Sequence, residues 1–374
     1  MEFRDLKTQY RKLKTEIDER VLDVMARAQF ISGPEVKELE QKLAEYVGTR
    51  HCITCANGTD ALELVLLAWG IGKGDAVFVP TFSFMSTAEV VASVGAYPLF
   101  VDIDPDTFNI DLEKLEQAII QAKNEGKYNL RAVIPVDLFG LPADYEAIAA
   151  IAKRYGLKVL EDGAQGFGGA IKGKRACSFG DAATTSFFPA KPLGCYGDGG
   201  AMFTDDDELA SLLRSLTVHG KGTEKYDNVR IGRNSRLDTL QAAVLLVKLK
   251  AFYEYELNAV NRVAEEYTKQ LSGIVKTPVV PEGYLSSWAQ YTIMLKSKEQ
   301  RNELQVKLKE QGIPSMIYYP RPLHLQTAFA FCGLQEGTFP VAEEASHCVL
   351  SLPMHPYLDK NEIQNICDAL KKNL

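Results

Sequence analysis

The chain has 374 residues, of which 46% are hydrophobic and 24% are charged. This balance is typical of a globular protein and excludes a disordered chain, and the length predicts about two domains. The net charge of −7 offers no broad cationic surface, so it argues against a protein that binds nucleic acid.

The sequence also argues against a membrane or secreted protein. No apolar run approaches the roughly 18 residues that a membrane-spanning helix needs. The N-terminus is charged from its second residue, unlike a secretory signal, and the seven cysteines are typical of reduced thiols rather than a disulfide framework. We therefore expect a cytoplasmic protein with no membrane partner.

Short apolar runs alternate with amphipathic segments over the first two-thirds of the chain. The predicted strands are Cys52–Cys55, Ala76–Pro80, Tyr97–Asp102, Ala132–Pro135, Lys158–Glu161, Thr184–Phe188 and Ala201–Thr204. The predicted helices between them are Asp60–Trp69, Ser86–Val94, Leu112–Lys123, Tyr145–Arg154 and Glu208–His219. Alternation of this kind predicts an α/β domain with a mostly parallel, seven-stranded sheet sandwiched by helices.

The remaining segments predict an N-terminal arm and a second domain. Helices are predicted at Lys14–Arg27 and Pro34–Tyr46, before the first strand, and a long helical run begins at Arg236. After it we expect a smaller α+β domain, with these elements: a strand at Tyr291–Leu295, a helix at Ser297–Gln311, a further element at Ser315–Tyr319 and a terminal helix from Asp359. The predicted division is therefore residues 1–250, the arm and large domain, and residues 251–374, the small domain.

Ligands of open α/β sheets bind beyond the carboxyl ends of the strands, and two of those turns carry an anion cradle and a ring. Gly58, Thr59 and Asp60 follow the first strand and open a helix, where backbone N–H groups attract anions. A helix N-cap in a tight turn is the alternative interpretation. Phe82 and Phe84 follow the next strand, and an aromatic ring there either stacks on a flat ligand or packs in the core.

Two further turns carry charged groups. Glu161 and Asp162 end a buried strand, where a carboxylate is costly unless a cation or donors meet it. Lys191 follows Ser186 in a loop rich in Gly and Pro, and burial there lowers a lysine pKa toward the neutral amine that forms Schiff bases. A structural ion pair is the alternative for Lys191.

Together these parts describe a holder for one ligand. An anion cradle, a stacking ring, a carboxylate and a reactive amine are the groups that pyridoxal 5′-phosphate (PLP) needs. The carboxylate keeps the pyridine nitrogen protonated, and the amine binds the aldehyde and then moves a proton as general acid and base. The combination predicts a PLP enzyme more specifically than any single motif does.

Several motifs in this order resemble the DegT/StrS family of sugar aminotransferases. They are FISGPEV at Phe30–Val36, NGTDAL at Asn57–Leu62, EDGAQ at Glu161–Gln165, SFFPAKPLGCYGDGGA at Ser186–Ala201, NSRLDTLQAA at Asn234–Ala243 and YYPRPLHLQ at Tyr318–Gln326. The resemblance runs nearly end to end. It implies a fold type I PLP enzyme, a homodimer and L-glutamate as amino donor.

The resemblance also implies residue roles. Lys191 would attach the coenzyme, Asp162 would pair with its pyridine nitrogen, Gln165 would hydrogen-bond the ring hydroxyl and Phe84 would stack on the ring. The coenzyme phosphate would be held by Gly58, Thr59, Asp60 and Ser186 of one subunit and Asn234 of the other. The active site would therefore be shared between subunits.

The acceptor in this family is a nucleotide-linked keto sugar, and the motifs look nearest to enzymes acting on UDP-linked 3-oxo-N-acetylglucosaminuronic acid in cell-surface polysaccharide biosynthesis. Arg236 would meet the sugar carboxylate, with Tyr318, Tyr319 and His324 as further substrate contacts. Tyr318 replaces a His usual in that subgroup, and Asp137 replaces a His common in the wider family. A UDP- or dTDP-linked 4-keto-6-deoxy sugar is therefore an alternative acceptor.

Other chemistries fit the sequence less well. Cys52 and Cys55 form a lone CxxC without a second pair or a His cluster, so we expect no metal site. A PLP-dependent sugar dehydratase of this type would carry His in place of Lys191. A PLP-sensing regulator would need an added DNA-binding domain, for which the short N-terminal arm leaves no room.

Overall fold

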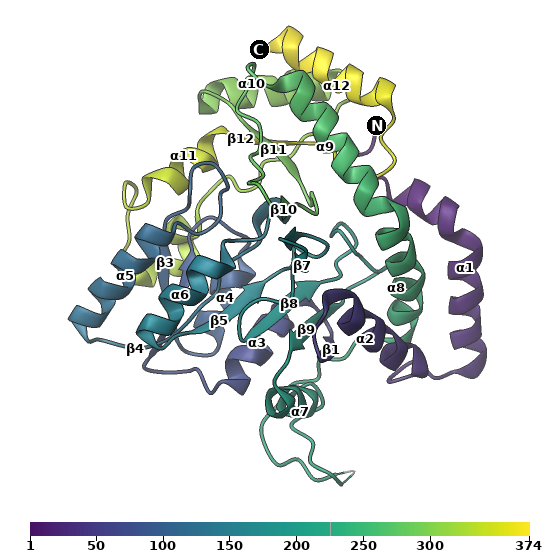
Figure 1. Ribbon diagram of the computed structural model, residues 1–374, viewed down its shortest axis with the longest axis vertical. Helices are drawn as coiled ribbons and strands as arrows, with labels where there is room; N and C mark the ends of the chain where they lie inside the picture. The colour runs from purple at the N-terminus through teal and green to yellow at the C-terminus, as the bar shows by residue number, and fades with distance from the viewer. Residues whose placement is uncertain (225) are drawn as a thin grey trace.

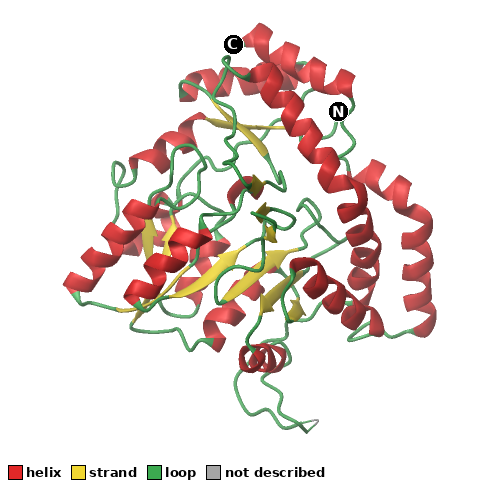
Figure 2. Cartoon of the chain, viewed as in Figure 1, coloured by secondary structure: helices red, strands yellow, loops and turns green. Residues whose placement is uncertain are grey.

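The computed structural model describes residues 1–224 and 226–374, and at its centre lies a seven-stranded sheet covered by helices (Figures 1 and 2). The strand order is β1-β9-β8-β5-β4-β2-β3, and β9 is antiparallel to both of its neighbours while the other pairs are parallel. The strands are β1 His51–Cys55, β2 Asp75–Pro80, β3 Tyr97–Val101, β4 Asn129–Val133, β5 Lys158–Asp162, β8 Ala182–Ser186 and β9 Gly200–Thr204. The predicted α/β class and mostly parallel sheet are confirmed.

The sheet strands are apolar because both faces are buried. In β2, Val77 and Val79 join one hydrophobic cluster and Phe78 joins another, as expected when successive side chains point to opposite faces. In β9, the neighbouring residues Met202 and Phe203 likewise belong to different hydrophobic clusters, one on each face of the sheet.

Helices cover the two faces of the sheet. One face carries α3 Gly58–Ala68, α4 Ser86–Ser93 and α7 Asp207–Leu216. The other carries α2 Pro34–Val47, α5 Leu112–Glu125, α6 Tyr145–Tyr155 and α8 Thr239–Ala251. The five helices predicted between strands are thus all present, with ends shifted by a few residues.

The first helix, α1 Leu6–Arg27, is longer than the predicted Lys14–Arg27. Asp5 caps it, because its side chain accepts a hydrogen bond from the Thr8 amide at 2.8 Å. It lies beside α8 (Figure 1), and Leu13 and Ile17 contact that helix. This packing supplies the stabilisation that its weak sequence pattern does not reveal.

The predicted long helical run is present, but it begins at Thr239 rather than Arg236 and contains a π-helical turn, Phe252–Glu256. Beyond the turn, α9 spans Leu257–Leu271. The helix passes through residue 250, and one hydrophobic cluster includes residues from both sides of that position. The predicted domain division at 250 and 251 stays a prediction.

The C-terminal part contains a two-stranded antiparallel sheet of β11 Tyr291–Met294 and β12 Val349–Leu352. The helices of this part are α10 Lys298–Glu310, α11 Pro340–Cys348 and α12 Lys360–Asn373, with short helical turns at Leu323–Leu325 and Thr327–Cys332. A further short turn, Leu138–Gly140, lies between β4 and α6. A third sheet joins β10 Tyr284–Leu285, β6 Ala170–Ile171 and β7 Lys174–Arg175.

One predicted element of this part is wrong. Ser315–Tyr319 makes a single bridge, between Met316 and Ser351, instead of forming a helix or a strand. The element that occupies the sheet there is β12, which the sequence analysis missed because a four-residue apolar stretch has no distinctive period.

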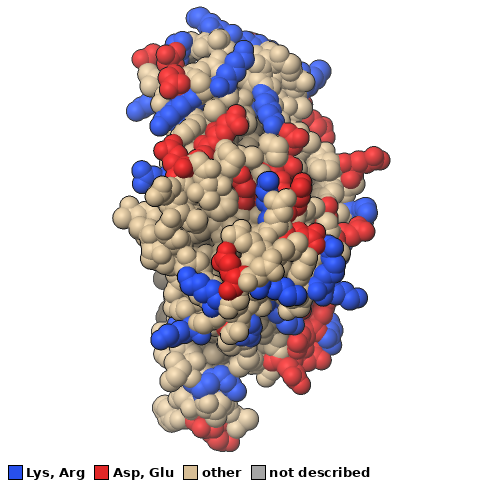
Figure 3. Space-filling view, turned by 90° about the vertical axis from the view of Figure 1, so that its left-hand side faces the viewer, with Lys and Arg blue, Asp and Glu red and all other residues tan. Residues whose placement is uncertain are grey.

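Among the residues that the structure describes, no helix is long and apolar enough to span a membrane. On the face drawn in Figure 3, basic and acidic side chains are interspersed rather than gathered into one large area of a single sign.

Candidate active site

The turns that the sequence analysis singled out follow β1, β2, β5 and β8. These strands run in the same direction. β1 and β8 are each antiparallel to β9, which lies between them, so β1 and β8 are parallel to one another, and the remaining neighbours are parallel pairs. Their carboxyl ends therefore lie along one edge of the sheet, where ligands bind in such folds.

Asp162 ends β5 and is buried, with 4% of its surface exposed. Its carboxylate accepts hydrogen bonds from the Thr87 hydroxyl at 2.8 Å and from the Ala164 amide at 3.2 Å. Burial raises the pKa of Asp162, while these two donors and the nearby Lys191 oppose that rise. A buried carboxylate next to an amine fits a ligand that brings its own positive charge.

Lys191 lies in the loop after β8, and its backbone amide donates to Phe188 O at 2.8 Å. Burial lowers the pKa of its amine, the Asp162 carboxylate opposes this, and the Arg4 guanidinium lowers the pKa further. A larger fraction of the amine is therefore neutral near pH 7 than in an exposed lysine, as nucleophilic attack requires.

Arg4 is a site residue that the sequence analysis missed. Its guanidinium donates to the backbone oxygens of Lys191 at 2.9 Å and Pro192 at 3.3 Å. The N-terminal arm thus holds the lysine loop from outside the sheet. No local pattern marks this role, since the contact joins residues 187 positions apart.

The turn predicted to be an anion cradle lies at the start of α3. Asn57 caps the helix by accepting a hydrogen bond from the Asp60 amide at 2.8 Å, so the capping interpretation of this turn is confirmed. A Cβ on Gly58 would lie 2.7 Å from the Ser186 Cβ, so glycine is required for the close approach of Ser186. Ser186 therefore lies beside the start of α3, where helix amides attract anions, and the predicted phosphate contacts stay a prediction.

The two aromatic residues after β2 take different environments. Phe82 is buried, whereas Phe84 is 52% exposed, and its ring centroid lies 6.4 Å from that of Tyr319. Of the two, Phe84 therefore has the free ring face that stacking on a flat ligand needs.

Gln165 is buried beside Tyr319. Its side-chain oxygen accepts from the Phe139 amide at 2.8 Å, and its side-chain nitrogen donates to the Tyr319 hydroxyl at 3.1 Å. These bonds fix the orientation of the amide and leave its second N–H available to a ligand. The predicted bond to the coenzyme hydroxyl stays a prediction.

Asn234 and Arg236 lie in the segment between α7 and α8. Asn234 is exposed, and the neighbouring Ser235 hydroxyl accepts from the Ala56 amide at 3.1 Å. Arg236 lines a hollow between α2 and α7 with Lys37, Glu40 and Arg214. Their predicted roles at the coenzyme and the sugar stay predictions.

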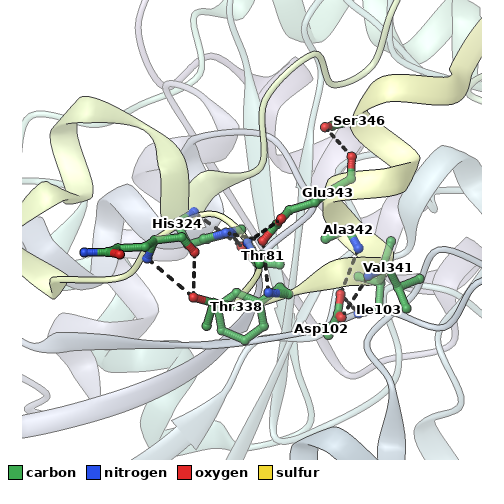
Figure 4. A network of polar contacts seen from close by, with 12 residues as sticks. Thr81, Asp102, Ile103, His324, Thr338, Val341, Ala342, Glu343 and Ser346 are labelled. Carbon is green, nitrogen blue, oxygen red and sulfur yellow. Dashed lines mark hydrogen bonds and ion pairs between the residues drawn. The ribbon is translucent and has the colours of Figure 1, made fainter. Parts of the chain in front are cut away.

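His324 is held inside the protein (Figure 4). Its side chain has no exposed surface, and its ring nitrogens bond to the Thr81 hydroxyl at 2.7 Å and the Glu343 carboxylate at 3.1 Å. Burial lowers the pKa of His324 and Glu343 raises it. Both ring nitrogens are thus used by the protein, so in this conformation the imidazole joins the end of β2 to α11 instead of contacting the sugar.

Tyr318 and Tyr319 are both half-buried, with ring centroids 5.8 Å apart. Tyr318 contacts Phe3 of the N-terminal arm, and Tyr319 contacts Phe82 and Phe84. The two tyrosines thus lie between the arm and the turn after β2, which is consistent with the predicted substrate contacts.

Cys52 and Cys55 are buried within β1. In the described part of the chain, no group of three or more His, Cys, Asp or Glu side chains is arranged to hold a metal ion.

A mixed sheet of this order, with a lysine after β8 and a buried carboxylate ending β5, defines the fold type I class of PLP-dependent transferases. The chain matches the DegT/DnrJ/EryC1/StrS aminotransferase family over residues 11–371 and belongs to that family. It is a PLP-dependent sugar aminotransferase.

Three relatives illustrate this membership. The chain is 48% identical to a Pseudomonas aeruginosa UDP-2-acetamido-2-deoxy-3-oxo-D-glucuronate aminotransferase, over 99% of both chains. The crystal structure of a DegT/DnrJ/EryC1/StrS aminotransferase from Brucella abortus is similar at 51% identity and a TM-score of 0.96, covering 100% of this chain and 99% of that one. The PLP form of a putative sugar aminotransferase from Streptococcus pneumoniae is similar at 28% identity and a TM-score of 0.89, covering 96% of each chain.

Proposed function

We propose that this cytoplasmic enzyme transfers the amino group of L-glutamate to UDP-linked 3-oxo-N-acetylglucosaminuronic acid, in the biosynthesis of a cell-surface polysaccharide. The products would be 2-oxoglutarate and the 3-amino sugar nucleotide. The observation that supports this acceptor most strongly is the 48% identity over the full length to the Pseudomonas relative.

The site residues fit the coenzyme and divide its work. Bound PLP supplies an aldehyde that takes up amino groups and a ring that accepts electrons from the substrate carbon. Lys191 then serves as the base that removes and returns the proton at that carbon, because burial favours its neutral amine. Asp162 balances the positive pyridine nitrogen, and the α3 amides with Ser186 hold the phosphate.

The proposed enzyme is a homodimer with shared sites, in which Asn234 and Arg236 of one subunit serve the site of the other. Arg236 lines a hollow whose lining does not include Lys191, and a second copy would bring Asn234 and Arg236 to the Lys191 loop. Large apolar side chains stand exposed on the same molecule: Leu22, Met25, Phe30, Ile31 and Phe188. A second copy of the chain would cover such side chains if they meet in one contiguous patch.

Complementation tests the shared site. Lys191→Ala and Asn234→Ala subunits, each impaired alone, should regain about one quarter of wild-type activity after random mixing, because half of the dimers are mixed and each carries one complete site of two. A mixture of Lys191→Ala with Asp162→Ala, whose changes fall in the same half-site, is the control and should recover nothing. Isolated mixed dimers without activity would contradict the shared site.

The substrate proposal is tested with L-glutamate and a panel of nucleotide keto sugars with and without a carboxylate at carbon 6. We expect the uronate to be preferred. Arg236→Ala should lower kcat/KM for the uronate by about 10–100-fold, the worth of a charge-assisted contact, and should affect 6-deoxy sugars little. Lys37→Ala removes another positive charge from the same hollow and is the matched control. Preference for a 4-keto-6-deoxy sugar would overturn the proposed acceptor.

A further inference from the structure

The carboxyl groups of Asp137 and Glu161 are both buried in the core next to the backbone of Asp162. Neither residue has exposed surface. Glu161 precedes Asp162 in β5, and the Asp137 amide donates to Asp162 O at 3.1 Å, so both are attached to the backbone that carries Asp162. The two carboxyl groups interact, so the protonation of one affects the pKa of the other.

The donors around this pair do not satisfy it when both groups are ionised. The two Glu161 oxygens accept from the backbone amides of Cys177 and Phe179. Asp137 Oδ1 accepts from the Tyr145 hydroxyl at 2.8 Å and the Ala143 amide at 3.1 Å. Asp137 Oδ2 is buried, and within residues 1–224 and 226–374 no group donates to it.

A proton supplies the missing donor. Ionised carboxylates only accept hydrogen bonds, so the buried Asp137 Oδ2 can pair with the neighbouring carboxyl group only if one of the two groups is protonated. The backbone is also built for close contact here, since a Cβ on Gly166 would overlap the Asp137 carboxyl.

The electrostatic surroundings of the pair also favour one bound proton. Burial raises the pKa of Asp137 to about 7 and that of Glu161 well above its ordinary value. In the described part of the chain, the titratable groups that face the pair are Asp162 from β5, Tyr145 from α6 and Cys177 from the loop before β8. Asp162 raises the pKa of Asp137, whereas the Tyr145 hydroxyl lowers it by donating a hydrogen bond.

We propose that Asp137 and Glu161 share one proton in the working enzyme, and that this proton spares the Asp162 carboxylate a second neighbouring negative charge. The two are positioning residues, because they act on the coenzyme through Asp162. This second part rests on the proposed role of Asp162. If both members of the pair were ionised, the repulsion would favour protonated Asp162, which no longer balances a protonated pyridine nitrogen.

Infrared spectroscopy of the holoenzyme tests the shared proton. The wild type should show the C=O stretching band of a protonated carboxyl group near neutral pH. Asp137→Asn and Glu161→Gln should each abolish it, because the new amide donates to the remaining carboxylate in place of the proton. A band missing from the wild type, or unchanged in both variants, would overturn the proposal.

Asp102→Asn is the matched control. Asp102 is also buried, but its oxygens accept from the backbone amides of Ile103, Val341 and Ala342 at 2.9–3.1 Å, as Figure 4 shows. This variant should keep the band. The fraction of protein that remains folded, measured by circular dichroism, identifies any variant in which the band is lost through unfolding.

The pH dependence of stability supplies a second measurement. Between the ordinary carboxyl pKa of about 4 and the pKa of about 7 in the folded protein, the folded pair holds a proton that the unfolded chain has released. Stability should therefore fall as pH rises through this window, and the fall should be smaller by one proton in Asp137→Asn. Equal slopes in urea unfolding of the two holoenzymes would contradict the shared proton.

The link to Asp162 is tested with pyridoxamine 5′-phosphate, which binds without a covalent bond to lysine. Its dissociation constant should rise several-fold more with pH in the wild type than in Asp137→Asn, whose pair keeps a single negative charge. Equal pH profiles would overturn the link to Asp162. If Asp162→Asn binds this probe like the wild type while the infrared band is present, the role of Asp162 fails and the shared proton stands.

Discussion

The Lys191→Ala variant will bind its coenzyme without a covalent bond, and its kcat will fall by at least about 10²–10⁴-fold, the usual loss when a positioned acid and base is removed. The reason is that the amine with a lowered pKa in the loop after β8 is gone. Mass spectrometry after borohydride reduction measures the attachment, since only a lysine-bound coenzyme becomes permanently fixed.

Lys248 offers a matched control for this variant. It is 1% exposed, burial lowers its pKa to about 8, and its ammonium lies 4.9 Å from the Tyr196 ring centroid. Lys248→Met should retain the covalent coenzyme, because Lys248 lies in α8 and not in the loop after β8. If the covalent coenzyme survives in Lys191→Ala and disappears in Lys248→Met, the attachment site is Lys248 and our assignment to Lys191 is wrong.

Replacing Asp162 with asparagine should lower kcat by about 10²–10³-fold, the loss typical of removing one preorganised charged partner. The fold should survive, since burial raises the pKa of Asp162 and the neutral side chain is therefore easier to bury than the charged one. Because the pKa of Asp162 is higher in the folded protein than in the unfolded chain, the contribution of this residue to folding stability should fall as pH rises. Steady-state kinetics and thermal unfolding of the same preparation measure the two effects.

Thr87→Val distinguishes the effect of the Asp162 charge from the effect of the hydrogen bond that holds its carboxylate. This change removes the hydroxyl that donates to Asp162 but leaves the carboxylate in place. We expect a loss of about tenfold or less, the worth of one hydrogen bond. If Asp162→Asn turns over at a near-normal rate, the carboxylate has no place in the chemistry.

The sheet was predictable because its strands are buried on both faces and separated by amphipathic helices. β2 illustrates this, since all six of its residues are buried. The π turn at Phe252–Glu256 was not predictable. Its Glu256 is buried against Gln9, at 3.0 Å, and Tyr357, so the contacts of this turn come from distant parts of the chain.

The site divides in the same way. Asp162, Ser186 and the start of α3 were found because each directly follows a strand, and strand ends converge on one edge. Arg4 and Thr87 were missed because they reach the site from the N-terminal arm and from α4. His324 lies within a motif of the family, yet its burial against Thr81 and Glu343 gives it a connecting role in this conformation.

The amino-acid sequence alone determined the α/β class, the edge at which the chemistry lies and the coenzyme, because hydrophobic period and strand-end residues are local properties of the chain. The tertiary structure alone decided which groups surround those residues. Hydrogen bonds and burial that set the pKa of Lys191, Asp162 and Asp137 come from segments up to 187 positions apart. Such long-range contacts leave no periodic trace in the sequence, since they depend on how whole elements pack.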